Sequence, residues 1–134
     1  LEGGYAIEDG RLSFLPLLAR LATERIDPAE GADLFHGTLV AGLADWAARA
    51  ATAQKTGTVL LSGGCLMNRQ LAEGLVAALA ARGLTGLTAR KMPPNDGGLS
   101  LGQAAMARAA AGRALPDNDG QEGETPCVSP YRPS

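Results

Sequence analysis

A short aliphatic run, Thr58–Leu61, constrains the fold of this chain most strongly. Glycines bound it on both sides, and four residues are too few for a helix, so it predicts a buried strand. Apolar spacings of three and four predict helices over 28–54 and 68–82, and a third helix follows over 99–111. A second, weaker strand is predicted over 84–90. This helix-strand-helix-strand-helix order indicates an α/β layer with parallel strands and right-handed crossovers.

The two ends of the chain differ from this alternating part. Asp9-Gly10 lies between two short apolar segments and predicts a hairpin, and a short helix is predicted over 16–24. Residues 116–134 are rich in Pro, Gly, Asp, Glu and Ser, so we expect a disordered tail after a domain of residues 1–115. Two or three strands are few for an independent sheet. We therefore expect part of a larger sheet domain, and the start on Leu1 suggests a fragment.

Composition excludes several classes of function. The chain is 46% hydrophobic, which suffices for a core, and its formal net charge is −2. No cluster of Lys or Arg is present, which disfavours a nucleic-acid surface. No apolar run is long enough to span a bilayer, so no membrane role is expected. The contexts of Cys65 and Cys127 do not indicate a disulfide framework, so a cytoplasmic location is the expectation.

Two glycine pairs follow the predicted strands. Gly63-Gly64 comes directly after the first strand, and Gly97-Gly98 follows the second strand and a loop. Ligands of open α/β sheets bind outside the carboxyl ends of the strands, where glycine lets the backbone approach a phosphate. Either pair alone is a weak signal. Together they predict two walls of one nucleotide-binding cleft.

Four other side chains could carry chemistry, and each has a simpler structural role. Asn68 is either the N-cap of the following helix or a hydrogen-bonding partner of a nucleoside. Asp96 is either a turn residue or a carboxylate ligand of a divalent metal. His36, the one histidine, is expected to be packed and hydrogen-bonded rather than catalytic. Cys65 is expected to be a small buried thiol.

Both loops resemble motifs of one known family. Leu61–Arg69 reads LSGGCLMNR and is similar to the LSGGVFQNR segment of the hydrogenase-maturation carbamoyltransferases, and 93–103 is similar to their PPNDGGIALGQ segment. Phe35-His36 also matches their FH helix. The order and spacing agree from about residue 5 to 111. The long second motif makes the resemblance specific.

The resemblance implies a fold and a reaction. The family's domain is similar to the universal tRNA threonylcarbamoyl-transfer proteins, with the actin/sugar-kinase (ASKHA) architecture. The family uses carbamoyl phosphate and ATP to form a carbamoyl-adenylate, and passes the carbamoyl group to the C-terminal cysteine of a partner maturation protein. That partner then yields the cyanide ligand of NiFe hydrogenase. The rival readings are carbamoyl transfer to tRNA or to a sugar, and a non-catalytic nucleotide-binding remnant.

The resemblance also implies site residues. Nucleotide-binding residues would be Gly63, Gly64, Asn68, Gly97 and Gly98, and Asp96 would be one ligand of a divalent metal such as Mg, Fe or Zn. The family's His-x-x-x-His metal pair has no counterpart in this sequence, because its region would precede Leu1. We therefore expect half of an ATP and metal cleft, with little or no turnover by this chain alone.

Overall fold

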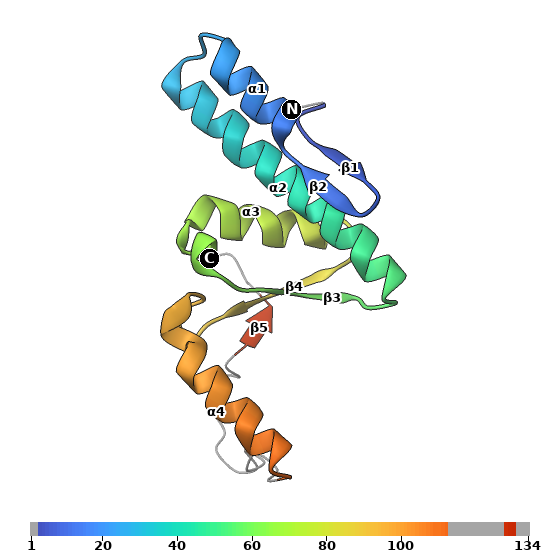
Figure 1. Cartoon of the computed structure of the whole chain (residues 1–134), viewed down its shortest axis with the longest axis vertical. Helices are drawn as coiled ribbons and strands as arrows, with labels where there is room; N and C mark the ends of the chain where they lie inside the picture. The colour runs from blue at the N-terminus through green and yellow to red at the C-terminus, as the bar shows by residue number, and fades with distance from the viewer. Residues whose placement is uncertain (1–2, 113–127, 131–134) are drawn as a thin grey trace.

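The computed structural model describes residues 3–112 and 128–130. An N-terminal hairpin packs beside two antiparallel helices, and a third helix lies between the second helix and a small sheet (Figure 1). A fourth helix extends from the opposite side of the sheet. The elements are β1 (Ala6–Glu8), β2 (Arg11–Ser13), α1 (Leu15–Thr23), α2 (Pro28–Ala53), β3 (Thr58–Leu61), the 3-10 helix η1 (Gly64–Met67), α3 (Arg69–Ala80), β4 (Thr85–Ala89), the 3-10 helix η2 (Asp96–Gly98), α4 (Leu99–Ala110) and β5 (Val128–Pro130).

The predicted hairpin and the predicted start of α2 are confirmed, and the residues at both places have the expected conformations and hydrogen bonds. Asp9 and Gly10 both have positive φ, at 49° and 76°, which is the conformation that a two-residue hairpin turn requires. Asp27 caps α2, because its Oδ1 accepts hydrogen bonds from the Ala29 and Glu30 N–H groups. Pro28 occupies the first helical position, where a missing N–H costs nothing.

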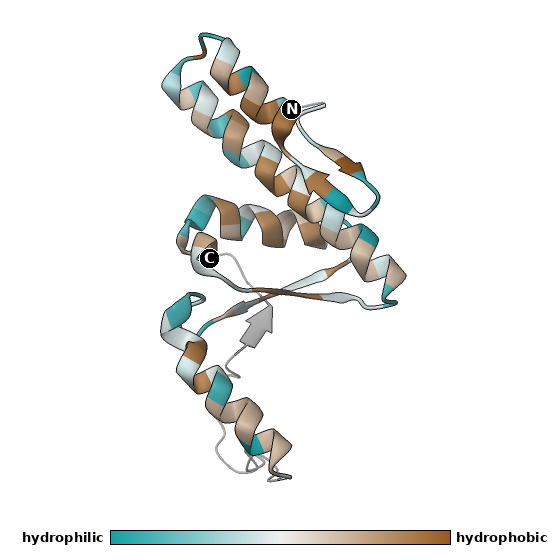
Figure 2. Cartoon of the chain, viewed as in Figure 1, coloured by the Kyte–Doolittle hydropathy of each residue, from teal (hydrophilic) through white to brown (hydrophobic). Residues whose placement is uncertain are grey.

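The sheet has the predicted parallel pairing, but the prediction that β3 is buried is wrong. Its residues alternate between exposed and half-buried, because only the side with Val59 and Leu61 packs against the core. β3 and β4 pair in parallel, with Val59 opposite Gly86 and Leu60 opposite Leu87, and α3 forms the crossover between them. Apolar residues run along α3 and along the strands beneath it (Figure 2). Strand β5 pairs with β4 in the antiparallel direction. The three residues of β5 lie within the segment that was predicted to be a disordered tail. The rest of that segment falls within 113–127 and 131–134, which are outside the described residues.

The core is built where α2 and α3 meet. Leu71, Leu75 and Leu79 of α3 are buried together with Ala44 of α2, as the spacing along α3 predicts. The two helices approach closely at Gly74, where a Cβ would lie 2.8 Å from Val40 Cγ2. α4 differs, because none of its residues is buried. None of the helices in the described ranges is long and apolar enough to cross a bilayer.

Two glycines of α2 occupy opposite environments and give a matched test of this packing. A Cβ at Gly42 would lie 2.7 Å from Phe14 Cε1, so Gly42→Ala should destabilise the chain by about 1–3 kcal/mol through overpacking. A Cβ at Gly37 meets nothing within 4 Å, so Gly37→Ala should stabilise by roughly 0.5–1 kcal/mol through helix propensity. Urea unfolding measures both. Equal effects of the two substitutions would contradict the packing of Phe14 and Tyr5, which flank the hairpin, on α2.

Thr38 of α2 provides a second test. Its side chain is fully buried, and its hydroxyl has no hydrogen-bond partner among the described residues. Thr38→Val replaces an unsatisfied hydroxyl by a methyl group of similar size, so it should raise the free energy of unfolding by about 1 kcal/mol. Thr52→Val is the control, because the Thr52 hydroxyl is exposed and donates to the Ala48 carbonyl at 2.9 Å. A loss of stability in Thr38→Val would show that the hydroxyl has a partner.

Candidate functional site

The first glycine turn begins where β3 ends. Gly63 has φ 117° and ψ 158°, a conformation that residues with a side chain rarely adopt, so the backbone requires glycine there. Gly64 is different, because its φ is not positive and an added Cβ would meet only Asn95 Cβ, at an ordinary 4.0 Å. The fold itself therefore gives no reason for glycine at position 64. An absent side chain there leaves the backbone open to a ligand.

The second glycine turn is held together by its own packing. Asn95 Oδ1 accepts from the Gly97 N–H at 3.0 Å, and the Asn95 carbonyl accepts from the Gly98 N–H at 3.0 Å. A Cβ at Gly97 would lie 3.0 Å from Pro93 Cγ, and one at Gly98 would lie 3.0 Å from the Pro93 carbonyl oxygen. A side chain at either position would therefore crowd Pro93. Their small size has a structural explanation that Gly64 lacks.

The two turns meet at one edge of the sheet, as the sequence predicts. The Gly63 N–H donates to the Pro94 carbonyl at 2.6 Å, and the Ser62 hydroxyl donates to the same oxygen at 3.4 Å. A cleft of about 590 Å³ lies between the end of β3, the second loop and the start of α4. Its lining includes Gly63, Asp96 and Gly98 of the predicted site, together with apolar side chains and Gln103 of α4. Gly64, Gly97 and Asn68 are not among the lining residues.

Asp96 is available as a ligand of a cation. Its side chain is exposed and, within residues 3–112, takes part in no described hydrogen bond or ion pair. Carboxylate oxygens are preferred ligands of hard divalent cations, so this residue suits the expected role. The described part of the chain contains no group of three or more His, Cys, Asp or Glu side chains that could hold a metal. The metal role of Asp96 therefore stays a prediction, for which the described residues offer a single exposed carboxylate at the cleft.

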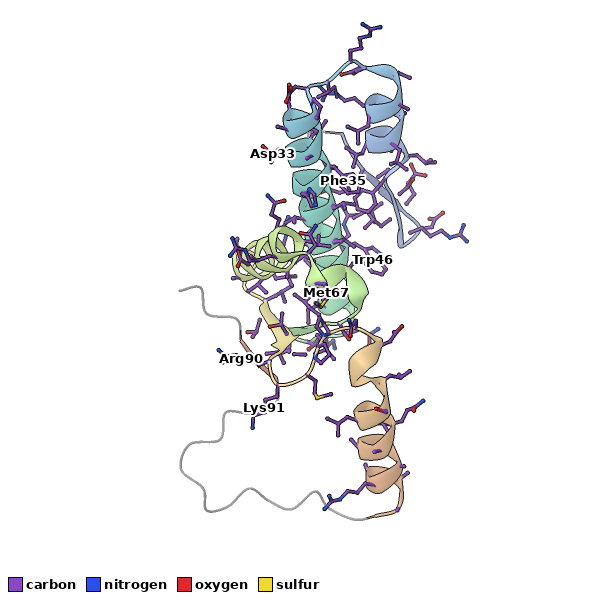
Figure 3. The ribbon with its side chains drawn as sticks, turned by 90° about the vertical axis from the view of Figure 1, so that its left-hand side faces the viewer. Asp33, Phe35, Trp46, Met67, Arg90 and Lys91 are labelled. Carbon is purple, nitrogen blue, oxygen red and sulfur yellow. The ribbon has the colours of Figure 1, made fainter. Side chains whose placement is uncertain are left out.

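A second cleft, of about 450 Å³, lies on the other side of Pro94. It is bounded by η1, the first turn of α3 and the end of β4, and it contains Arg69, Glu73 and Arg90. Met67 lies on η1, and Arg90 and Lys91 lie on the loop that follows β4 (Figure 3). Sequence reasoning did not identify these two arginines as site residues. The available signal was their position, because Arg69 is the first residue of α3 and Arg90 directly follows β4.

Asn68 and His36 are joined by a hydrogen bond. Asn68 caps α3, because its Oδ1 accepts from the Leu71 N–H at 3.2 Å, and this confirms the structural reading. The opposite end of the amide therefore faces His36, and Asn68 Nδ2 donates to His36 Nε2 at 2.9 Å. His36 Nδ1 donates in turn to the Ala32 carbonyl at 2.9 Å. The expectation that His36 is hydrogen-bonded is confirmed.

The prediction that Cys65 is a buried thiol is wrong. Cys65 is exposed, whereas the next residue, Leu66, packs against the core formed by α2 and α3. The cause is the 3-10 turn of η1, which the sequence did not predict. Within this turn Leu66 takes the inward position, so the preceding thiol points to solvent. Cys127 lies outside the described residues.

Comparisons with known proteins agree with the sequence motifs. A family described as "Carbamoyltransferase, Kae1-like Domain, second subdomain" matches residues 2–103. Carbamoyltransferase HypF of Rhizobium leguminosarum bv. viciae is 58% identical over 109 residues, which cover 81% of this chain and 14% of that protein. Carbamoyltransferase HypF2 of Cupriavidus necator is 52% identical over 106 residues, covering 77% of this chain and 13% of that protein.

A solved structure shares the fold. The crystal structure of HypF from T. kodakarensis matches with a TM-score of 0.61 and 25% sequence identity, over 74% of this chain and 13% of that chain. This chain thus spans about one seventh of the length of these relatives. The family match over residues 2–103 includes both glycine turns. The chain therefore belongs to the HypF carbamoyltransferase family, in the part that corresponds to the second subdomain of its Kae1-like domain.

Proposed function

We propose that this chain forms half of the nucleotide and metal cleft of a carbamoyltransferase. The observation that carries the proposal is the meeting of the two glycine turns, where the Gly63 N–H donates to the Pro94 carbonyl and Gly63, Asp96 and Gly98 line one cleft. The N-terminus of α4, which no side chain caps, opens on the cleft beside it. Such a helix end attracts phosphate through its positive dipole and N–H groups. A nucleotide phosphate therefore fits this edge of the sheet.

Asp96 would add the metal function to the same edge. We place its carboxylate as one ligand of a divalent ion, Mg, Fe or Zn, that neutralises the charge of the nucleotide phosphates. The described residues offer no larger cluster, so the remaining ligands would come from segments that correspond to other parts of the longer relatives. Large apolar side chains at the cleft are exposed, with Leu60 at 64%, Leu99 at 59% and Met106 at 72%. Exposed apolar walls are typical of a surface that another part of a protein covers.

In the complete enzyme this cleft would hold the adenylate during carbamoyl transfer. The thiolate of a C-terminal cysteine on a partner protein attacks the carbamoyl carbon of a carbamoyl-adenylate. The bond from that carbon to the phosphate oxygen breaks, and AMP leaves with the electron pair. The residues of this chain bind and orient the adenylate while the carbamoyl group moves to the thiol. Carbamoyl transfer to tRNA is disfavoured, because the formal net charge is −2 and no basic cluster is present.

The half-cleft is tested by comparing this chain with a chimera. In the chimera, this chain replaces the matching 109-residue segment of the R. leguminosarum relative. Isothermal titration with ATP and Mg²⁺ should give weak binding to this chain alone and tight, metal-dependent binding to the chimera. The chimera should also transfer a labelled carbamoyl group from carbamoyl phosphate to a peptide that ends in cysteine. Tight, metal-dependent binding by this chain alone would contradict the half-cleft, and a chimera without transfer would contradict the function.

Two neighbouring glycines separate binding from folding in the same chimera. Gly64→Ala should leave the unfolding temperature unchanged and weaken nucleotide binding by about tenfold, because its Cβ occupies space that only a ligand needs. Gly63→Ala should lower stability by roughly 1–3 kcal/mol, because its φ of 117° is strained for alanine. Calorimetry measures both quantities. Unchanged nucleotide affinity in a folded Gly64→Ala chimera is the result that sinks the assignment.

A further inference from the structure

The segment that carries Gly64 is fixed at both of its ends. Its start is held by the hydrogen bond from the Gly63 N–H to the Pro94 carbonyl. Its end is Asn68, which closes η1 through its N–H to the Cys65 carbonyl at 3.1 Å and donates from its side chain to His36. His36 belongs to α2, a helix that otherwise has no part in the cleft. The glycine turn is therefore hydrogen-bonded to the second loop at its start and to α2 at its end.

We infer that His36 is a positioning residue for the glycine turn, acting through Asn68. This inference rests on the proposed function, because it states how the phosphate-facing segment is kept in place. Capping α3 needs only the Asn68 Oδ1, so the cap does not require His36. The second bond, to His36 Nε2, is what ties Asn68 to α2. His36 of the Phe35-His36 pair therefore has a structural role, which is to position Asn68, and this role requires neither metal binding nor acid-base catalysis.

Hydrogen-bonding capacity fixes the state of the imidazole. The Ala32 carbonyl can only accept, so His36 Nδ1 carries the proton. The Asn68 amide nitrogen can only donate, so His36 Nε2 offers its lone pair and the ring is neutral. The neighbouring Phe35 ring packs against the imidazole in a T-shaped arrangement, with centroids 5.5 Å apart and planes at 88°. Asn68 retains one N–H and one lone pair, and it is exposed, so a bound nucleotide can use both.

The close approach of α2 and α3 makes this bond feasible. Val40, one turn after His36 on the same face of α2, contacts Gly74 of α3 so closely that a Cβ there would lie 2.8 Å from Val40 Cγ2. Because residue 74 is glycine, α3 can lie close against α2. Asn68, which caps the start of α3, therefore comes within hydrogen-bonding distance of His36. The bond between His36 and Asn68 therefore depends on the packing of the core. Through this bond, the packed helices hold the glycine turn in a fixed position.

Amide hydrogen exchange of the whole chain tests the positioning role directly. His36→Leu removes the acceptor, so exchange of the Leu66, Asn68 and Leu71 amides should rise about three- to tenfold, the effect of one lost hydrogen bond. The Arg82 and Gly83 amides at the far end of α3 should not change. His36→Gln should restore the wild-type rates, because its amide oxygen can accept from Asn68. Unchanged rates in His36→Leu, or an equal rise at both ends of α3, would overturn the inference.

Kinetics of the chimera test the link to the nucleotide. His36→Leu should raise KM for ATP about three- to tenfold and leave KM for carbamoyl phosphate unchanged, and His36→Gln should restore KM for ATP. Asn68→Ser keeps the cap but cannot reach His36, so adding His36→Leu to it should have no further effect. An unchanged KM in His36→Leu, or additive effects of the two substitutions, would overturn the inference. If the wild-type chimera transfers no carbamoyl group, the proposed function fails, and the exchange rates alone decide whether His36 positions the turn.

Discussion

The hydrogen bond between the Gly63 N–H and the Pro94 carbonyl is the contact on which the candidate site depends. It joins two loops that are separated along the chain by η1, α3 and β4, and it is short, at 2.6 Å. The bond can form because β3 and β4 are parallel neighbours, so their carboxyl ends lie at the same edge of the sheet. Parallel pairing depends in turn on α3, which covers one face of both strands with its leucines. The core of this chain thus determines where its glycine turns meet.

The sequence was sufficient for the elements whose signals are local. Thr58–Leu61 forms a strand as predicted, although the strand is not buried as expected. The inward side of α3 is buried, and Asn68 and Asp27 cap α3 and α2. Each of these signals lies within a few residues of the feature that it predicts. Periodicity and capping residues therefore predict these helices, strands and caps directly. The meeting of the two glycine turns followed from one further rule, the common edge of parallel strands.

The sequence failed where the outcome depends on packing between distant segments. The short helix η1 has no periodicity to reveal it, and it exposes Cys65, which was expected to be buried. The hydrogen bond from Asn68 to His36 spans 32 residues and requires the close approach of α2 and α3. The distinction between the two glycine pairs is equally hidden. The difference appears only when a Cβ is added at each position. At Gly97 and Gly98 it would crowd Pro93 of the same loop, whereas at Gly64 it would meet only Asn95 Cβ at 4.0 Å.

The central claim is that phosphate and metal meet at this edge of the sheet. Addition of Mn²⁺ with ATP to the isotope-labelled chain tests it most directly, because a paramagnetic ion broadens only the amide signals near it. Gly63, Gly64 and Gly98 should broaden together at millimolar ligand, and Asp96→Asn should remove most of this broadening. Broadening confined to the N-terminal hairpin or to the far end of α4, with the glycine signals unaffected, would contradict the account.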